Sequence, residues 1–213
     1  PATMNNIIPA ILAHDENTFR ERLRLVEAHA PLIQIDVMDG TFVPNSTWCD
    51  LSVLQTVETP AQFELHLMVQ HPKKIIAEAL TIPSIKRLIW HIESKAQHAT
   101  LIKLCHEQKR EAGIAISPHS SLDILETYAA DIDEILVLGA EPGFSGQSLD
   151  MNMVARVHEI HERWPKVTIG FDVGVKAETI PFLREAGVSR FCAASSIFDA
   201  QNPVGTLKQL QEI

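Results

Sequence analysis

The sequence predicts a single eight-stranded β/α barrel, the TIM-barrel class, and three observations support this prediction. Short apolar segments alternate with amphipathic segments along the whole chain. The 213 residues hold eight such pairs, which leaves roughly 27 residues for each pair. No Gly-x-Gly-x-x-Gly turn follows an early strand, as an open doubly wound sheet usually requires. Eight strands of this kind close into a parallel barrel, so we expect one domain over residues 1–213.

The first four strand–helix units follow from apolar runs and helix signals. Phe19, Leu23, Leu25 and Val26 mark the apolar side of the helical stretch after the first apolar run. Pro72 is a good residue for the first turn of the third helix. We expect strands over residues 6–12, 32–37, 63–69 and 87–91, and helices over about 16–28, 51–57, the stretch after Pro72, and 95–109.

The last four units show the same alternation, with clear stop signals. Pro165 and Gly187 follow the sixth and seventh helical stretches, where each ends a helix. We expect strands over residues 112–116, 134–138, 167–171 and 190–194, and helices over 120–129, 152–164, 177–186 and 204–213.

Composition excludes several classes of partner. The net charge of −9 argues against binding to nucleic acids or anionic membranes, which require basic patches. No apolar run reaches the length of a membrane span, and no signal peptide is visible at the start. Three cysteines form neither a metal knuckle nor a disulfide framework, which favours a reducing, cytoplasmic location.

Polar residues at strand ends form the candidate site, because βα loops carry the chemistry of such barrels. Gln34 and Asp36 are two residues apart and therefore point to the same side of their strand. Asp36, His66 and Asp172 come from three strands and converge on the axis. Two carboxylates and an imidazole suit a divalent metal, and two carboxylates also suit proton transfer on both faces of a carbon.

Each of these residues also has an ordinary structural interpretation. A single aspartate at a strand end is commonly a helix cap, and a single buried histidine is commonly a satisfied core residue. We expect His91 to be such a core histidine, held by Glu93 or by a backbone group. Met38 and Met68 are typical core-filling residues. Three polar residues at one depth on three strands favour the functional interpretation.

Glycines after the sixth and seventh strands predict an anion-binding region. Gly143 and Gly146 bracket a tight loop, and Gly174 and Ser195 follow the last two strands. Backbone N–H groups of such loops bind phosphate in barrels, commonly near strands seven and eight. The alternative is that these are ordinary turn glycines.

Four segments in order resemble the ribulose-phosphate 3-epimerase family along nearly the whole chain. They are Pro-Ala-Ile-Leu-Ala at residues 9–13, Asp-Val-Met-Asp-Gly-Thr-Phe-Val-Pro-Asn at 36–45, His-Leu-Met-Val at 66–69 and Glu-Pro-Gly-Phe-Ser-Gly-Gln at 141–147. The resemblance implies a barrel that interconverts D-ribulose 5-phosphate and D-xylulose 5-phosphate in the pentose phosphate pathway. It also implies homo-oligomers.

The resemblance further implies roles for individual residues. One aspartate removes the proton at C3 and the other returns it on the opposite face, and these match Asp36 and Asp172. One divalent metal ion (Zn, Fe, Mn or Mg) is held at the positions of Gln34, Asp36, His66 and Asp172. The sugar phosphate is bound at the positions of Ala10, Met38, His66, Met68, Gly143, Phe144, Ser145, Gly146, Val173, Gly174, Ala194 and Ser195.

The chain departs from the family pattern around the substrate. Gln34 replaces a metal-binding histidine, and a neutral amide oxygen suits harder ions than Zn²⁺. Ala10 replaces a serine, and Leu138 and Gly139 replace a methionine and a threonine. Val173 and Ala194 replace glycines that let a phosphate approach closely, and Ser145 replaces a glycine of the loop after the sixth strand.

Three hypotheses follow from these departures. The first is an active metal-dependent epimerase on ribulose 5-phosphate. The second is a related epimerase or isomerase on a different sugar, which need not be phosphorylated, suggested by Ala10, Val173 and Ala194. The third is a catalytically silent barrel with a binding role, suggested by Gln34, and it predicts a collapsed barrel mouth.

Overall fold

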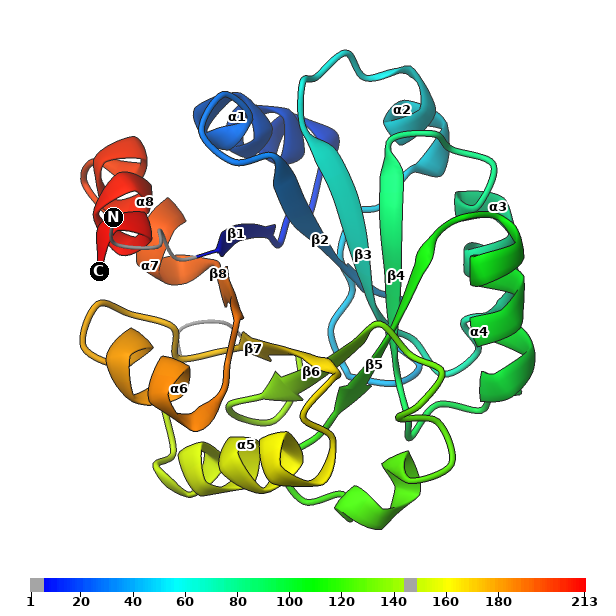
Figure 1. Ribbon diagram of the computed structural model, residues 1–213. Coiled ribbons are helices and arrows are strands. Elements are labelled where there is room, and N and C mark those ends of the chain that lie inside the picture. Colours follow the sequence, from blue (N-terminus) through cyan, green and yellow to red (C-terminus); the bar gives the residue numbers. More distant parts are fainter. Residues whose placement is uncertain (1–5, 144–148) are drawn as a thin grey trace.

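The computed structural model describes residues 6–143 and 149–213, and its strands form a closed parallel barrel in the order β1 to β8. Figure 1 shows the strands around a central axis with the helices outside them. The predicted fold class is therefore confirmed. The strands are β1 (Ile7–Ile11), β2 (Leu32–Met38), β3 (Gln62–Met68), β4 (Ile85–His91), β5 (Glu111–Ile116), β6 (Glu134–Leu138), β7 (Thr168–Asp172) and β8 (Arg190–Ala193).

The helices cover the outside of the barrel and follow their strands in sequence. They are α1 (Glu16–Val26), α2 (Leu51–Thr56), α3 (Lys73–Ala79), α4 (His98–Glu107), α5 (Asn152–Arg163), α6 (Ile180–Ala186), α7 (Ser195–Phe198) and α8 (Pro203–Glu212). Within the described residues, none of these helices is long and apolar enough to cross a membrane.

Helix α1 illustrates how local sequence sets these elements. The Asp15 side chain accepts a hydrogen bond from the Thr18 N–H at 2.8 Å and so caps the first turn. Phe19, Leu23 and Val26 then fall on one buried face at helical spacing. The apolar spacing predicted this helix, although Leu25, expected on the same side, is exposed.

Two elements differ from the sequence-based expectation. The segment 120–129 forms only a 3₁₀ turn, η1 (Leu122–Leu125), continued by i→i+3 bonds such as Tyr128 N–H to Leu125 C=O. Helix α7 was not predicted, because it is a four-residue turn with no apolar period to reveal it. It begins directly after β8 and places Ser195 and Ser196 at the mouth of the barrel.

Strand register sets the depth of each inward-pointing side chain. Asp36 of β2 pairs with His66 of β3, and Leu138 of β6 pairs with Asp172 of β7. The alternate residues Ile35 and Val37 point outward and pack in the apolar layer under the helices. The carboxyl ends of the strands therefore present the polar residues to one mouth.

The opposite end of the barrel interior holds a network of buried ion pairs, which we call the base network. It comprises Glu64, Arg87, Glu111, Glu134 and Arg190. Arg87 Nη1 lies 2.5 Å from Glu64 Oε2 and 2.9 Å from Glu134 Oε2, and these three side chains are fully buried. Arg87 also contacts Glu111, and Arg190 lies 2.8 Å from Glu134. These residues fill the barrel interior with paired charges.

Candidate active site

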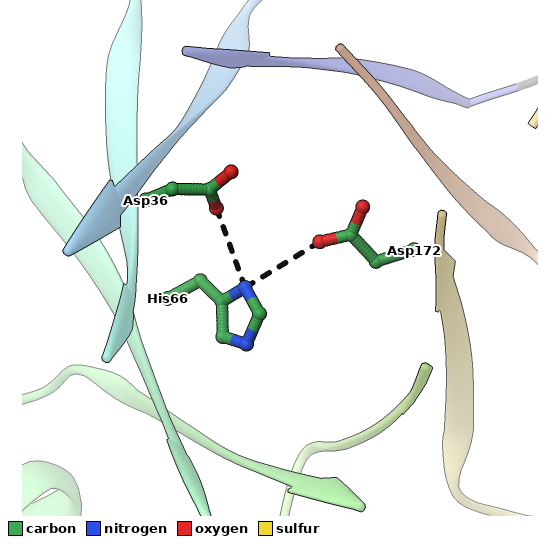
Figure 2. A group of neighbouring side chains, drawn as sticks. All are labelled: Asp36, His66 and Asp172. Carbon is green, nitrogen blue, oxygen red and sulfur yellow. Dashed lines mark hydrogen bonds and ion pairs between the residues drawn. The ribbon is translucent and has the colours of Figure 1, made fainter. Parts of the chain in front are cut away.

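Asp36, His66 and Asp172 converge at the mouth of the barrel. His66 Nδ1 lies 3.3 Å from Asp36 Oδ1 and 3.4 Å from Asp172 Oδ2. Figure 2 shows both carboxylates directed at this one ring nitrogen. All three side chains are buried, with exposed fractions of 6%, 0% and 7% in that order. β2, β3 and β7 thus bring two carboxylates and one imidazole to a single point.

Gln34 lies directly beneath these carboxylates and connects them. Its Nε2 donates hydrogen bonds to Asp36 Oδ1 at 2.8 Å and to Asp172 Oδ2 at 2.9 Å. Its Oε1 is buried and has no hydrogen-bond partner among the described residues. An unpartnered buried carbonyl oxygen is costly, so the bridge between the carboxylates is formed at the expense of this oxygen.

The electrostatics of this group are strongly perturbed. Burial raises the pKa of Asp36, and the neighbouring Asp172 raises it further, while the hydrogen bond to His66 opposes the change. Burial opposes a charge on His66, but hydrogen bonds to Asp172 and Asp36 raise its pKa to about 9. Perturbed groups in a cavity are characteristic of sites where protons are transferred.

A second perturbed pair lies behind His66. Burial lowers the pKa of His91 to about 4. Burial opposes a charge on Glu93, but hydrogen bonds with His91, Ser120 and Ser117 lower its pKa to about 2. Glu93 does contact His91, as expected, but the other side of the His91 ring faces the candidate site.

The segment 36–45 and its neighbour Thr47 hold the loop after β2 in place. Thr47 Oγ1 donates to the Asp36 carbonyl at 2.7 Å and accepts from the Met38 N–H at 2.9 Å. Asn45 Nδ2 donates to the Gly143 carbonyl at 2.6 Å, which links this loop to the loop after β6. Asn45 and Thr47 are positioning residues that spacing alone did not identify.

The carboxylates line a pocket at the mouth of the barrel with a free volume of about 40 Å³. Of the residues expected to bind substrate, the cavity is lined by Met38, His66, Met68, Gly143, Val173, Gly174, Ala194 and Ser195. Ala10 does not line it and packs instead in an apolar cluster inside the barrel. Phe144, Ser145 and Gly146 lie outside the described residues.

Sequence reasoning missed several lining residues. The most relevant is Lys176, the one lysine or arginine in the lining among the described residues. It lies two positions after Gly174, in the loop expected to bind phosphate. A lysine so soon after a glycine turn is the sequence signal that could have identified it as part of an anion site. The others are Leu12, Pro142, Val175, Cys192, Ala193 and Ser196, while Leu138, expected near the substrate, also lines the cavity.

The loop after β7 retains an unusual conformation despite its substitution. Val173 has φ +74° and Gly174 has φ +78°. A β-branched residue with positive φ costs on the order of 1–3 kcal/mol. Hydrogen bonds on both sides of Val173 hold this conformation despite its cost. Val173 N–H donates to Asp172 Oδ1 at 2.8 Å, and Thr179 Oγ1 donates to the Gly174 carbonyl at 2.7 Å.

The residues at the mouth also fit a divalent metal ion. One ligand atom each from Asp36, His66 and Asp172 lies within 4.8 Å of the other two. Ligands bound tetrahedrally at about 2.1 Å are separated by about 3.4 Å, which is close to the contacts found here. In this conformation Gln34 directs its Nε2, and not its Oε1, at the two carboxylates.

Fold and site together define a β/α-barrel enzyme with paired carboxylates in a cavity at the carboxyl ends of its strands. The model of the Ribulose-phosphate 3 epimerase family matches residues 6–198. The chain belongs to this family and is an isomerase of the epimerase type.

Several proteins named ribulose-phosphate 3-epimerase are similar to the chain over nearly its full length. The Candida glabrata protein is 31% identical, covering 97% of this chain and 91% of its own length. The Bacillus subtilis protein is 32% identical, covering 92% of this chain and 93% of its own length. The cytoplasmic isoform of Oryza sativa subsp. japonica is 30% identical, covering 99% and 95%.

Solved structures share the fold at much lower identity. A 3-keto-L-gulonate-6-phosphate decarboxylase from Vibrio cholerae aligns with TM-score 0.74 and 11% identity, covering 99% of this chain and 97% of its own. A 3-hexulose-6-phosphate synthase aligns with TM-score 0.70 and 16% identity, covering 97% and 98%. These likenesses support the barrel architecture alone.

Proposed function

We propose that the protein inverts C3 of D-ribulose 5-phosphate to give D-xylulose 5-phosphate, using Asp36 and Asp172 as acid and base and one divalent metal ion. The observation that carries this proposal is the contact of both carboxylates with His66 Nδ1, at 3.3 and 3.4 Å. Family membership and the names of the relatives supply the reaction and the substrate.

The two carboxylates divide the proton transfer between them. One aspartate accepts the proton from C3, which gives an ene-diolate, and the other aspartate donates a proton to the opposite face of the same carbon. Asp36 and Asp172 come from β2 and β7, which are not neighbours in the barrel. Their separate origins allow a planar ene-diolate to lie between them. Burial raises the pKa of Asp36 and so makes it a stronger base once ionised.

The proposed metal site uses His66 Nδ1, one oxygen each of Asp36 and Asp172, and Gln34 Oε1. A bound divalent ion supplies charge that stabilises developing negative oxygens. Gln34 presents its NH₂ group to the carboxylates, so its amide oxygen becomes a ligand only if the two ends of the amide exchange places. We expect metal to be held more weakly than by a histidine at this position.

The phosphate is proposed to bind at the loops after β7 and β8. Gly174, Ala194 and Ser195 offer backbone N–H groups along the cavity wall, and Lys176 offers a positive charge. Val173 takes up room at this wall, although its backbone keeps the left-handed conformation. In this proposal, the positive charge of Lys176 offsets the loss of phosphate-binding space caused by the Val173 side chain.

The decisive experiment follows hydrogen exchange at C3. Purified protein supplied in turn with Mn²⁺, Fe²⁺ and Zn²⁺ is incubated with D-ribulose 5-phosphate in D₂O. We expect deuterium at C3 and formation of xylulose 5-phosphate with at least one ion, and loss of both after chelation. A protein that binds none of these ions and exchanges no hydrogen would refute the proposal.

Gln34→His tests the proposed ligand position directly. If Gln34 is a weakened ligand, the histidine variant binds Mn²⁺ and Zn²⁺ more tightly and its epimerase rate rises as well. Metal affinity and rate that both stay unchanged would show that Gln34 is not a ligand.

A second candidate, an epimerase of an unphosphorylated sugar, is favoured by the position of Val173 in the cavity wall. A panel of ketoses and ketose phosphates separates the two. Lys176→Met sharpens the comparison, because it raises KM only for phosphorylated substrates if Lys176 binds phosphate. A clear preference for ribulose 5-phosphate excludes this candidate.

A further inference from the structure

Arg22 of α1 contacts both the end of β1 and the short helix α7. Its Nη1 donates a hydrogen bond to the Leu12 carbonyl oxygen at 2.7 Å. Its guanidinium carbon lies 5.0 Å from the centroid of the Phe198 ring, which is within the range of a cation–π contact. Figure 1 shows α1 and α7 close to β1 on one side of the barrel. Because β1 pairs with β8, Arg22 lies where the barrel closes.

Both partners of Arg22 are connected to the wall of the candidate site. Leu12 lines the cavity itself. The Phe198 N–H donates to the Ala194 carbonyl at 2.9 Å, and Ala194 and Ser195 also line the cavity. Helix α7 is a single turn, so a shift of Phe198 moves Ala194 as well. Arg22 therefore lies one contact behind the wall where the phosphate is proposed to bind, without lining the cavity itself.

The charge of Arg22 has no acidic partner, unlike the charges of the other arginines in α1. Arg20 lies 2.7 Å from Glu16, and Arg24 has a glutamate three positions away on each side. The residues three and four positions from Arg22 are all uncharged: Thr18, Phe19, Leu25 and Val26. The half-buried Arg22 forms no ion pair with any residue that the structure describes. Its positive charge is therefore available to an anion nearby.

The mouth of the barrel has little positive charge to offer a phosphate group. A phosphate monoester carries about −1.5 to −2 charges at neutral pH, and Asp36 and Asp172 already lie at the mouth. Lys176 is the one lysine or arginine in the lining among the described residues. The net charge of −9 provides no general attraction for an anion. A second cation close behind the wall lowers the electrostatic cost of bringing the phosphate there.

We propose that Arg22 strengthens binding of the substrate phosphate through its positive charge, which Leu12 and Phe198 hold behind the wall formed by Ala194 and Ser195. This inference rests on the proposed function, because it requires a phosphorylated substrate at the loops after β7 and β8. Arg22 acts through this wall and is a positioning residue. Its loss should therefore change phosphate affinity and KM, and leave kcat nearly unchanged.

Three variants on one helix separate the charge of Arg22 from its packing. Arg22→Met removes the charge and keeps an unbranched side chain of similar helix propensity. Arg22→Lys keeps the charge and a donor for the Leu12 carbonyl. Arg20→Met is the matched control, because it also removes one arginine charge from α1, but from a partly exposed pair with Glu16. If Arg22→Met fails to fold, Arg22→Gln replaces it, since glutamine is neutral and still offers a donor.

Titration with inorganic phosphate, followed by phosphorus-31 NMR at low ionic strength, tests the proposal without any assay of activity. We expect Arg22→Met to weaken phosphate binding about fivefold, Arg22→Lys to weaken it less than about twofold, and Arg20→Met to leave it unchanged. Added salt should weaken binding to the wild type more than to Arg22→Met, because it screens a charge that the variant lacks. KM for D-ribulose 5-phosphate should rise in Arg22→Met by the same factor.

Two results would overturn the proposal. One is equal phosphate affinity and equal KM in the wild type and Arg22→Met. The other is an Arg22→Lys variant as weak as Arg22→Met, because the charge is then not the cause.

The inference and the proposed function fail in different ways. A wild type that neither binds inorganic phosphate nor converts D-ribulose 5-phosphate overturns the proposed function, and this inference with it. A wild type that does both, and that loses phosphate affinity on Lys176→Met but not on Arg22→Met, overturns this inference alone.

Discussion

The two ends of the barrel interior both bury charged groups, but they balance the charge differently. In the base network, Arg87 lies between Glu64 and Glu134, and Arg190 adds a second cation to Glu134. At the mouth, the ion pairs that Asp36 and Asp172 make with described residues are to His66 alone.

This contrast indicates which cluster stabilises the barrel and which performs chemistry. Buried carboxylates with arginine partners have their charge balanced, and losing one partner is costly. Carboxylates joined only by a histidine and an amide leave negative charge in a cavity open to solvent. The mouth is therefore the end of the barrel that can accept a cation and a reacting substrate.

The largest expected effect is on catalysis at the mouth. Asp172→Asn removes one acid/base group and should lower the rate of C3 inversion by about 10²- to 10⁴-fold. Stability should stay the same or rise, because the buried carboxylate pair loses a charge. Urea unfolding and a coupled epimerase assay measure the two effects. A fall in stability as large as that of a base-network variant would break the comparison.

The next largest effect is on stability at the base. Arg87→Met leaves Glu64 and Glu134 without their shared partner and should cost about 3–5 kcal/mol of unfolding free energy. Activity per folded molecule should be retained. Lys86→Met is the control on the same strand, since Lys86 is 44% exposed and only 3.5 Å from Glu111. Lys86→Met should lower the unfolding free energy by less than about 1 kcal/mol. Equal losses in the two variants would contradict the assignment of the base network as the stabilising cluster.

The lowered pKa of Glu93 predicts how the unfolding free energy falls at acid pH. Its folded pKa is about 2, below the ordinary value of 4.5 that the unfolded chain retains. Its contribution is therefore complete above pH 4.5 and is lost as the pH falls from 4.5 toward 2. Because the group is partly exposed, we expect about 1–3 kcal/mol, which Glu93→Gln should lack. Urea unfolding between pH 2 and 5 measures this difference. If the unfolding free energies of wild type and variant fell in parallel with pH, Glu93 would not contribute as predicted.

The smallest expected effect concerns the phosphate side of the mouth. Val173→Gly relieves about 1–3 kcal/mol of backbone strain but loses about 0.5–1 kcal/mol through the freer unfolded chain. Net stability should change little. KM for ribulose 5-phosphate should fall about tenfold, the equivalent of one charge-assisted hydrogen bond of about 1.5 kcal/mol. An unchanged KM would mean that Val173 does not restrict the phosphate.

The barrel could be predicted from the sequence because its signals are local and repeated eight times. The convergence of Asp36, His66 and Asp172 was also predictable, since it follows from strand order and the inward side of each strand. Short elements such as α7 carry too few residues to show a period.

Contacts between loops and between side chains could not be predicted from the sequence. The Asn45 to Gly143 bond joins residues 98 positions apart, and no local pattern predicts such a partner. The amide of Gln34 was expected as a weakened metal ligand, and its bridge between two carboxylates depends on rotamers that only packing determines. Ala10 was expected at the substrate, but its register places it deeper in the barrel.

The left-handed backbone at Val173 leaves no room for a side chain at Gly139. A Cβ atom on Gly139 would lie 2.4 Å from the Val173 carbonyl oxygen and 2.8 Å from the Phe171 ring. Positions 139 and 173 are therefore coupled, because any side chain at 139 requires the backbone at 173 to move. Gly139→Ala alone should be more harmful than Gly139→Ala combined with Val173→Gly, which gives that backbone more freedom.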